Sequence, residues 1–133
     1  MSLPITANIR ASDIPGYKTV QHLIPEGNFL KYTIIWAIRV EYYVTELNEL
    51  SRRLVLDLGH DFDLDDKPLI RVSMLQPGQF TIPVGTQIMG LAFGDIRDRR
   101  WEGLNYEVYD FEDNCIRATC HSIELSQVAK PTL

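Results

Sequence analysis

Cysteine, positive charge and long apolar runs are all scarce in this chain of 133 residues. Its two cysteines, Cys115 and Cys120, would lie about 16 Å apart on opposite faces of one strand, which excludes a disulfide between them within one subunit. Their spacing is also poor for zinc, and no second pair of Cys or His residues completes a site. Because the N-terminus shows no secretory signal, free thiols predict a cytoplasmic protein.

The charge balance is acidic, with 13 Lys and Arg residues against 18 Asp and Glu residues and a formal net charge of −5. Proteins that follow the phosphates of nucleic acids need a basic face, and anionic membranes attract basic segments. The most apolar stretch, residues 33–44, is interrupted by Arg39 and Glu41 and is too short to span a bilayer. We therefore expect no nucleic-acid partner and no membrane association.

Sequence motifs for catalysis and cofactor binding are missing too. The chain has no nucleotide-binding loop, nucleophile elbow, metalloprotease pattern or dinucleotide fingerprint. The acidic segment 60–66 matches the first ligand positions of a calcium loop, but Asp66 stands where that loop needs Gly, and Val72 replaces the closing Glu. We interpret this segment as a solvated turn and expect no metal site and no cofactor.

The most informative feature present is the alternation of apolar and polar residues from Phe29 to Thr45. Successive side chains of a strand point to opposite faces, so the pattern predicts a strand with one apolar and one mixed face. At about 3.3 Å per residue such a strand would extend about 50 Å, which a small domain accommodates by bending it around a core. The predicted apolar face consists of Leu30, Tyr32, Ile34, Trp36, Ile38, Val40, Tyr42 and Val44.

Turn residues divide the rest of the chain into shorter elements. Residues 45–51 fit an amphipathic helix capped by Thr45, whereas residues 53–58 fit either a helix or a strand and favour a strand. Further strands are predicted at 17–24, 69–75, 80–94, 104–111 and 115–125.

These elements predict a mainly β fold: a single-domain antiparallel β-barrel or sandwich with a long bent strand and at most one or two short helices. We expect an extended N-terminal arm at residues 1–16, the β domain at 17–126 and a C-terminal tail at 127–133.

One basic cluster, residues 95–101, places three arginines beside Trp101. Guanidinium groups next to an indole can clamp a carboxylate or phosphate and stack a planar group. Asp95 and Asp98 neutralise much of this charge, so we favour a self-paired surface loop with Trp101 tucked into the end of the barrel.

The last predicted hairpin carries the best acid–base candidates, His121, Glu107 and Tyr109, on the polar faces of its strands. If these faces lined a barrel lumen together with Arg39, they would form a pocket able to transfer protons and hold an anion. We favour the alternative, in which the polar faces are exposed and the more apolar faces form the core.

Two functions stay open at this point, and the residues leave undecided whether the protein is an enzyme. The first is a non-catalytic protein-interaction or structural module that acts as a homo-oligomer. It is suggested by the N-terminal arm and by Ile35 and Tyr43, which add apolar groups to the mixed face of the long strand. We favour this function.

The second function is a small-molecule-binding β-barrel, either a carrier or a cofactor-free isomerase or cyclase. Its ligand would be small and hydrophobic or aromatic, held in a lumen by Arg39, Trp36, Tyr42 and Tyr106. A closed dry core would favour the interaction module, and a large aromatic lumen would favour the ligand-binding barrel.

Overall fold

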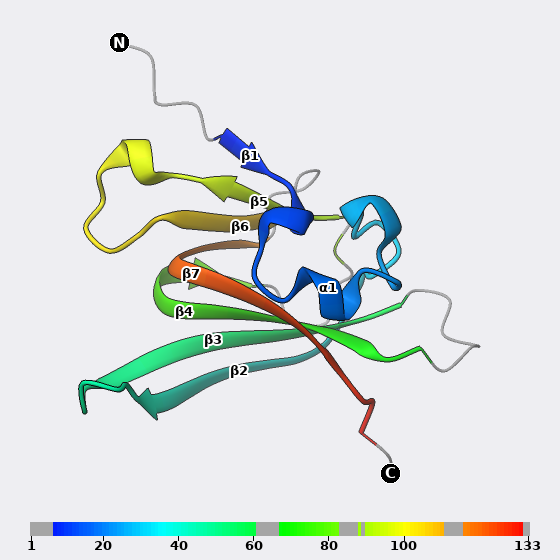
Figure 1. Cartoon of the computed structure of the whole chain (residues 1–133), viewed down its shortest axis with the longest axis horizontal. Helices are drawn as coiled ribbons and strands as arrows, with labels where there is room; N and C mark the ends of the chain where they lie inside the picture. Colours follow the sequence, from blue (N-terminus) through cyan, green and yellow to red (C-terminus); the bar gives the residue numbers. More distant parts are fainter. Residues whose placement is uncertain (1–6, 61–66, 83–87, 89, 111–115, 132–133) are drawn as a thin grey trace.

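A computed structural model describes residues 7–60, 67–82, 88, 90–110 and 116–131. Its seven strands form one antiparallel sheet in the order β1-β5-β6-β7-β4-β3-β2 (Figure 1). The strands are β1 Ala7–Ile9, β2 Ile34–Val44, β3 Leu50–Gly59, β4 Leu69–Thr81, β5 Leu91–Asp95, β6 Tyr106–Asp110 and β7 Arg117–Val128. The short helical elements are α1 Tyr17–Val20 and the 3-10 turns η1 Ala11–Asp13, η2 Pro25–Gly27 and η3 Arg97–Arg99.

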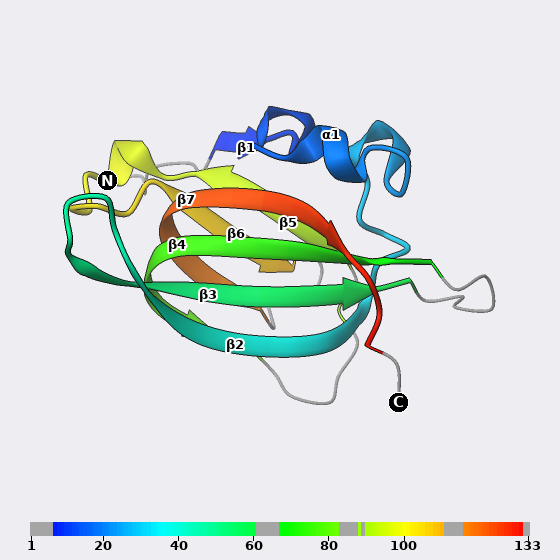
Figure 2. The same ribbon diagram turned by 60° about the horizontal axis from the view of Figure 1, so that its bottom comes forward.

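This architecture confirms the predicted mainly β, antiparallel fold with few helices. The sheet does not close on itself, so the description as a barrel or sandwich fits only loosely. Two strands, β4 and β7, are long enough to run through both halves of a strongly bent sheet. The first half of β4 pairs with β3, and the first half of β7 pairs with β6. Figure 2 shows β7 curving over β4 between these two halves.

The core lies inside the bend, where the N-terminal turns and α1 cover the sheet (Figure 2). Ile14, Val20 and Ile24 are buried against the sheet, and Phe29 meets Phe93 of β5 edge-to-face at 5.5 Å between ring centroids. The buried apolar residues of the sheet include Leu54, Leu56, Leu58, Ile70, Val72, Met74, Val108, Ala118, Ile123 and Leu125.

Gly16 is the point where the N-terminal segment approaches β7 most closely. The backbone N–H of Leu125 donates a 2.8 Å hydrogen bond to the carbonyl of Pro15. At Gly16 φ is +89°, and a Cβ atom built there would lie 1.8 Å from the carbonyl oxygen of Leu125. Only glycine tolerates both this backbone conformation and this contact.

The N-terminal predictions need correction. Residues 17–24 form α1 and a following turn rather than a strand, because Val20 and Ile24 lie one helical turn apart and both enter the core. The expected extended arm is part of the fold from residue 7 onward: β1 pairs with β5, and Ala11 is buried. Residues 1–6 of that arm lie outside the described residues, as do residues 61–66 of the acidic segment and Cys115.

The predicted helix at 45–51 is also wrong. Thr45 belongs to a hairpin loop, in which its backbone N–H donates a 2.8 Å hydrogen bond to the carbonyl of Glu49. The strand β3 begins directly after this loop, at Leu50. Pairing with β2 outweighs helix propensity here, because Leu50 lies opposite Val44 and the strands then stay in register to Ala37. The strand favoured at residues 53–58 is confirmed.

The long strand is shorter than predicted, and its two faces are not uniform. It begins at Ile34, after a turn closed by the N–H of Tyr32 on the carbonyl of Phe29. A β-bulge between Ile35 and Ala37 then shifts the register, so that Ile35 and Ile38 both share the core face. A bulge reverses the alternation of side chains, and Trp36 therefore lies on the outer face, over Gly59.

Candidate functional site

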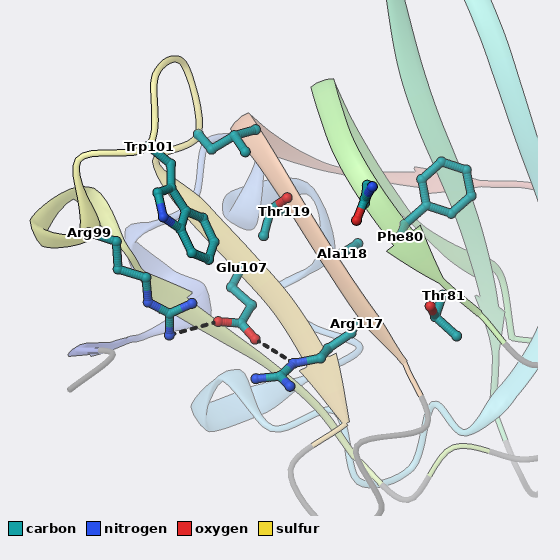
Figure 3. Close-up of a pocket in the computed structure, with 10 residues that line it drawn as sticks. Phe80, Thr81, Arg99, Trp101, Glu107, Arg117, Ala118 and Thr119 are labelled. Carbon is teal, nitrogen blue, oxygen red and sulfur yellow. Dashed lines mark hydrogen bonds and ion pairs between the residues drawn. The ribbon is translucent and has the colours of Figure 1, made fainter. Parts of the chain in front are cut away.

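A pocket of about 500 Å³ lies where β4, β6 and β7 meet the connection between β5 and β6 (Figure 3). Glu107 of β6 and Thr119 of β7 are direct cross-strand partners and line it, whereas their neighbours Val108 and Ala118 contribute side chains to the core. The pocket is therefore on the sheet face opposite the core.

Glu107 is the central charged group of this pocket. It is only 4% exposed, because two arginines cover it from different elements. Arg117 on β7 donates from Nε to Oε1 at 3.1 Å, and Nη2 of Arg99 in η3 lies 3.3 Å from Oε2. On the other side of β6, Glu107 pairs with Gly94, which has no side chain to crowd it. The carboxylate thus fixes both guanidinium groups at the pocket wall.

Two exposed aromatic side chains flank the same pocket. The guanidinium carbon of Arg99 lies 5.2 Å from the ring centroid of Trp101, a cation–π distance. Phe80 lies on β4 at the other margin of the pocket, with its ring directed away from Trp101 (Figure 3). Trp101 is half exposed, whereas we had expected it to be buried at the end of the barrel.

One ion pair within the basic cluster is of the predicted self-paired kind. Arg97 forms an ion pair with Asp95, whose carboxylate also accepts the backbone N–H of Arg97 at 3.0 Å. These bonds lower the pKa of Asp95. Arg99 departs from the prediction, because η3 turns its side chain towards Glu107 instead of towards a neighbouring aspartate.

The four acid–base candidates do not share a cavity. Glu107 is held by Arg99 and Arg117, while His121 is exposed on β7. The hydroxyl of Tyr109 donates a 2.6 Å hydrogen bond to Oδ1 of Asn8, and burial is the first cause of its raised pKa. Arg39 lies on β2, on the far side of β3 and β4 from these residues. Among the described residues no carboxylate–imidazole pair forms, so these side chains do not make the proton-transfer pocket that a polar lumen would have formed.

The expected ligand-binding residues are also dispersed. Trp36 and Arg39 line a cavity of about 230 Å³ on the outer face, whereas Tyr106 lines another of about 260 Å³ beside Arg97. Tyr42 is 66% exposed on β2. In the part of the chain that the structure describes, these residues do not line a common lumen.

A cluster of ion pairs around Asp57, beside the Trp36 cavity, was not predicted by sequence reasoning. Asp57 is buried and accepts hydrogen bonds from Arg71 at 2.8 and 3.0 Å and from Arg39 at 3.4 Å. The hydrogen bond to Asp57 raises the pKa of Arg71. The register Ala37–Asp57–Arg71 across three strands creates this cluster, and only the strand pairing could have revealed it.

The second candidate site is a surface, which we call the β2 edge. β2 is the last strand of the sheet order, and among the described strands only β3 pairs with it. Val40 lies opposite the fully buried Leu54, so this part of β2 shares the sheet face that forms the core, but here that face is exposed to solvent. The exposed apolar residues of the β2 edge are Val40, Tyr42, Val44, Leu47 and Leu50.

The described residues contain no group of three His, Cys, Asp or Glu side chains that could hold a metal ion. None of the described helices has the length and apolar character needed to cross a membrane. In comparisons with protein-family models, curated proteins and solved structures, no match to this chain was found. Function therefore has to be inferred from the surfaces of the chain itself.

Proposed function

We propose that the protein is a non-catalytic interaction module that acts as a homodimer, in which β2 pairs antiparallel with β2 of a second copy. The observation that carries this proposal is the β2 edge: an 11-residue strand at the open end of the sheet with exposed apolar side chains. An edge strand of this kind, paired on one side only among the described strands, presents backbone groups and apolar surface that favour pairing with another chain.

The charges of β2 match those of a second β2 in one register. In an antiparallel pair with its two-fold axis at Val40, Arg39 lies opposite Glu41 of the second copy, and the reverse contact is identical. Within one chain, Nε of Arg39 lies 2.9 Å from Oε1 of Glu41, and both side chains are partly exposed. In a dimer, the Arg39–Glu41 ion pair within one chain can be replaced by an ion pair between Arg39 of one copy and Glu41 of the other. Opposite charges on directly opposed residues stabilise an antiparallel strand pair.

The apolar face supports the same register. Val40 faces its own copy across the axis, and Ile38 lies opposite Tyr42 of the second copy. Val40 and Tyr42 are exposed in the single chain, and pairing adds cross-strand contacts that cover part of their apolar surface. The bulge lies near the start of β2, and the register from Ala37 to Val44 is regular, so this stretch offers a second strand an uninterrupted series of backbone groups. In the dimer, one face of the paired β2 strands would carry apolar contacts and the other face would carry ion pairs.

Charge reversal tests both the dimer and its register. We expect sedimentation equilibrium of the full chain to give twice the 15.3 kDa chain mass at micromolar concentration. Arg39→Glu or Glu41→Arg alone would place like charges opposite each other twice per dimer and weaken association by about tenfold or more. The double variant restores opposite charges and should restore association.

The matched control is Arg97→Glu, which makes the same change of charge at an exposed residue far from β2 and should leave association unchanged. Circular dichroism checks that every variant keeps its β structure. A monomer at all concentrations, or two single reversals that dimerise as well as the natural chain, would contradict the proposal.

We also propose that the protein works in a reducing compartment such as the cytoplasm. Cys120 is a free thiol, fully buried in the core, and this burial raises its pKa to about 12. Reducing compartments keep such thiols unpaired. When cells are lysed in denaturant together with an alkylating agent, both cysteines should be labelled as free thiols. Recovery of the protein with a disulfide would contradict this location.

A further inference from the structure

We propose that the pocket around Glu107 binds a small aromatic carboxylate. Its ring would lie against Trp101, and its carboxylate would accept hydrogen bonds from Arg117. This inference is independent of the proposed dimer, since the pocket lies on β4, β6 and β7 and is separated from β2 by β3.

The charge of the pocket favours a single negative group. Two guanidinium groups, of Arg99 and Arg117, surround one buried carboxylate, so the cluster keeps one excess positive charge. Glu107 engages only the Nε of Arg117, and 62% of the Arg117 side chain is exposed. Its terminal nitrogens are therefore left to a ligand. A guanidinium presents donors in a planar fork that matches the two oxygens of a carboxylate.

The walls of the pocket favour a planar ring. Trp101 is exposed to a degree unusual for a large aromatic residue and lines the pocket beside Glu107, whereas the ring of Phe80, at the opposite margin, points away from Trp101 (Figure 3). A volume of about 500 Å³ is in the range of small-molecule sites. Stacking on an indole stabilises planar groups, and the neighbouring guanidinium of Arg99 holds the indole in place.

Gly78 keeps one wall of the pocket clear. A β-bulge in β4 between Pro77 and Phe80 brings this glycine against the pocket residues. A Cβ atom at Gly78 would lie 2.7 Å from Oγ1 of Thr119 and 3.1 Å from a methyl group of Leu104. The bulge also changes the direction of the strand just before Phe80. The pocket is thus shaped by the backbone of β4 as well as by its side chains.

An isolated phosphate group fits this pocket less well. Phosphate carries more negative charge than the single excess positive charge here, and the buried carboxylate of Glu107 would repel it. It would also leave the indole of Trp101 without a stacking partner. A polyanion is disfavoured further by the net charge of −5 on the whole chain. A monoanion with an attached ring uses every feature of the site.

Nuclear magnetic resonance of the full chain tests this proposal, because the sequence has only two tryptophans. Titration with naphthoate should shift the indole N–H signal of Trp101 in a saturable way and leave that of Trp36 unchanged. Acetate, which lacks the ring, and naphthylmethanol, which lacks the charge, should each bind at least about tenfold more weakly.

Three variants assign the contacts. Arg117→Gln should weaken naphthoate binding by about tenfold and leave naphthylmethanol binding unchanged, since charged hydrogen bonds contribute most of this difference. Trp101→Ala should weaken both ligands, as followed by the backbone signal of Thr119. The matched control is Arg100→Gln, at an exposed arginine of the same loop that does not line the pocket.

Some results would overturn the proposal. Equal shifts of the Trp36 and Trp101 signals would show non-specific adhesion of the ligand. Equal affinity for naphthoate and naphthylmethanol would exclude a carboxylate site, and phosphate binding more tightly than naphthoate would exclude the aromatic class. All variants replace exposed side chains, but Arg117→Gln also removes a partner of Glu107; Arg117→Lys keeps that charge and should recover part of the affinity.

Discussion

Arg71 donates two hydrogen bonds to Asp57 across the β3–β4 ladder, from Nε at 2.8 Å and from Nη2 at 3.0 Å. Asp57 lies on the outer face of the sheet but is buried there, and this bidentate contact fixes the orientation of its carboxylate. Asp57 also accepts a weaker bond from Arg39, so it connects three neighbouring strands.

Removal of this carboxylate should destabilise the sheet. Asp57→Ala leaves two arginines close together without their common partner, and we expect a loss of about 2 kcal/mol in the free energy of unfolding. This is below the loss for a fully buried pair, because Arg71 is partly exposed. Urea denaturation measures it. Asp95→Ala breaks an exposed ion pair and serves as the control, expected to have a much smaller effect.

Gly59 and Trp36 form a second tight contact, in which a Cβ atom at Gly59 would lie 2.1 Å from Nε1 of the indole. Gly59→Ala should therefore displace the indole and lower the free energy of unfolding by about 1–3 kcal/mol. In a Trp36→Ala background the same change should cost much less, since the colliding group is gone. A double-mutant cycle measured by urea denaturation gives the coupling. Equal costs in both backgrounds would mean that the indole does not lie over Gly59.

Gly16 and Gly103 provide a matched pair for the attachment of the N-terminal segment. Both have positive φ, +89° and +72°, but only Gly16 is crowded, by the carbonyl of Leu125. Gly103→Ala should cost about 1 kcal/mol from backbone strain alone. Gly16→Ala should cost at least about 2 kcal/mol more and loosen α1 from β7, as measured by hydrogen exchange at the N–H of Leu125. Similar costs at both sites would contradict the close approach.

Cys120 should make the free energy of unfolding fall as the pH rises into the alkaline range. Burial raises its pKa to about 12, above the ordinary value of the unfolded thiol. The folded state therefore keeps a proton that the unfolded state loses, and stability is fully retained below the ordinary thiol pKa and falls as pH rises above it.

The expected loss is up to about 1.4 kcal/mol per pH unit between about pH 9 and pH 11. Urea denaturation across this range, compared with Cys120→Ala, isolates the contribution of this thiol from that of other groups. An identical pH dependence in the two proteins would show that the thiol is not buried in the folded state.

Sequence patterns predicted the strands where alternation was regular and failed where the backbone departs from it. The hairpin of β6 and β7 and the strand at Leu69 follow from alternation and turn residues alone. In β7 the alternation changes: Cys120 and Ile123 are both buried, although three residues apart. Such a change comes from the bend of the paired strands, which local sequence does not encode.

The candidate sites were predictable only in part. The guanidinium–indole pair of Arg99 and Trp101 was visible as a cluster, and Glu107 was visible as a candidate on its strand. Their meeting, and the role of Arg117 in place of His121, depend on the register of β6 and β7. The exposure of Tyr42 on an edge strand depends on the order of strands in the sheet, which alternation does not predict.

The central claim, pairing of β2 with a second β2 at a two-fold axis on Val40, is tested most directly by disulfide trapping. In a Cys115→Ser background, Val40→Cys places two thiols opposite each other across the axis, within the range of a disulfide. Leu47→Cys, in the exposed hairpin loop, is the control for random collision. Under mild oxidation, we predict that Val40→Cys forms a covalent dimer rapidly and nearly completely while Leu47→Cys does not. Equal or slower cross-linking at Val40→Cys than at Leu47→Cys would contradict the proposed dimer.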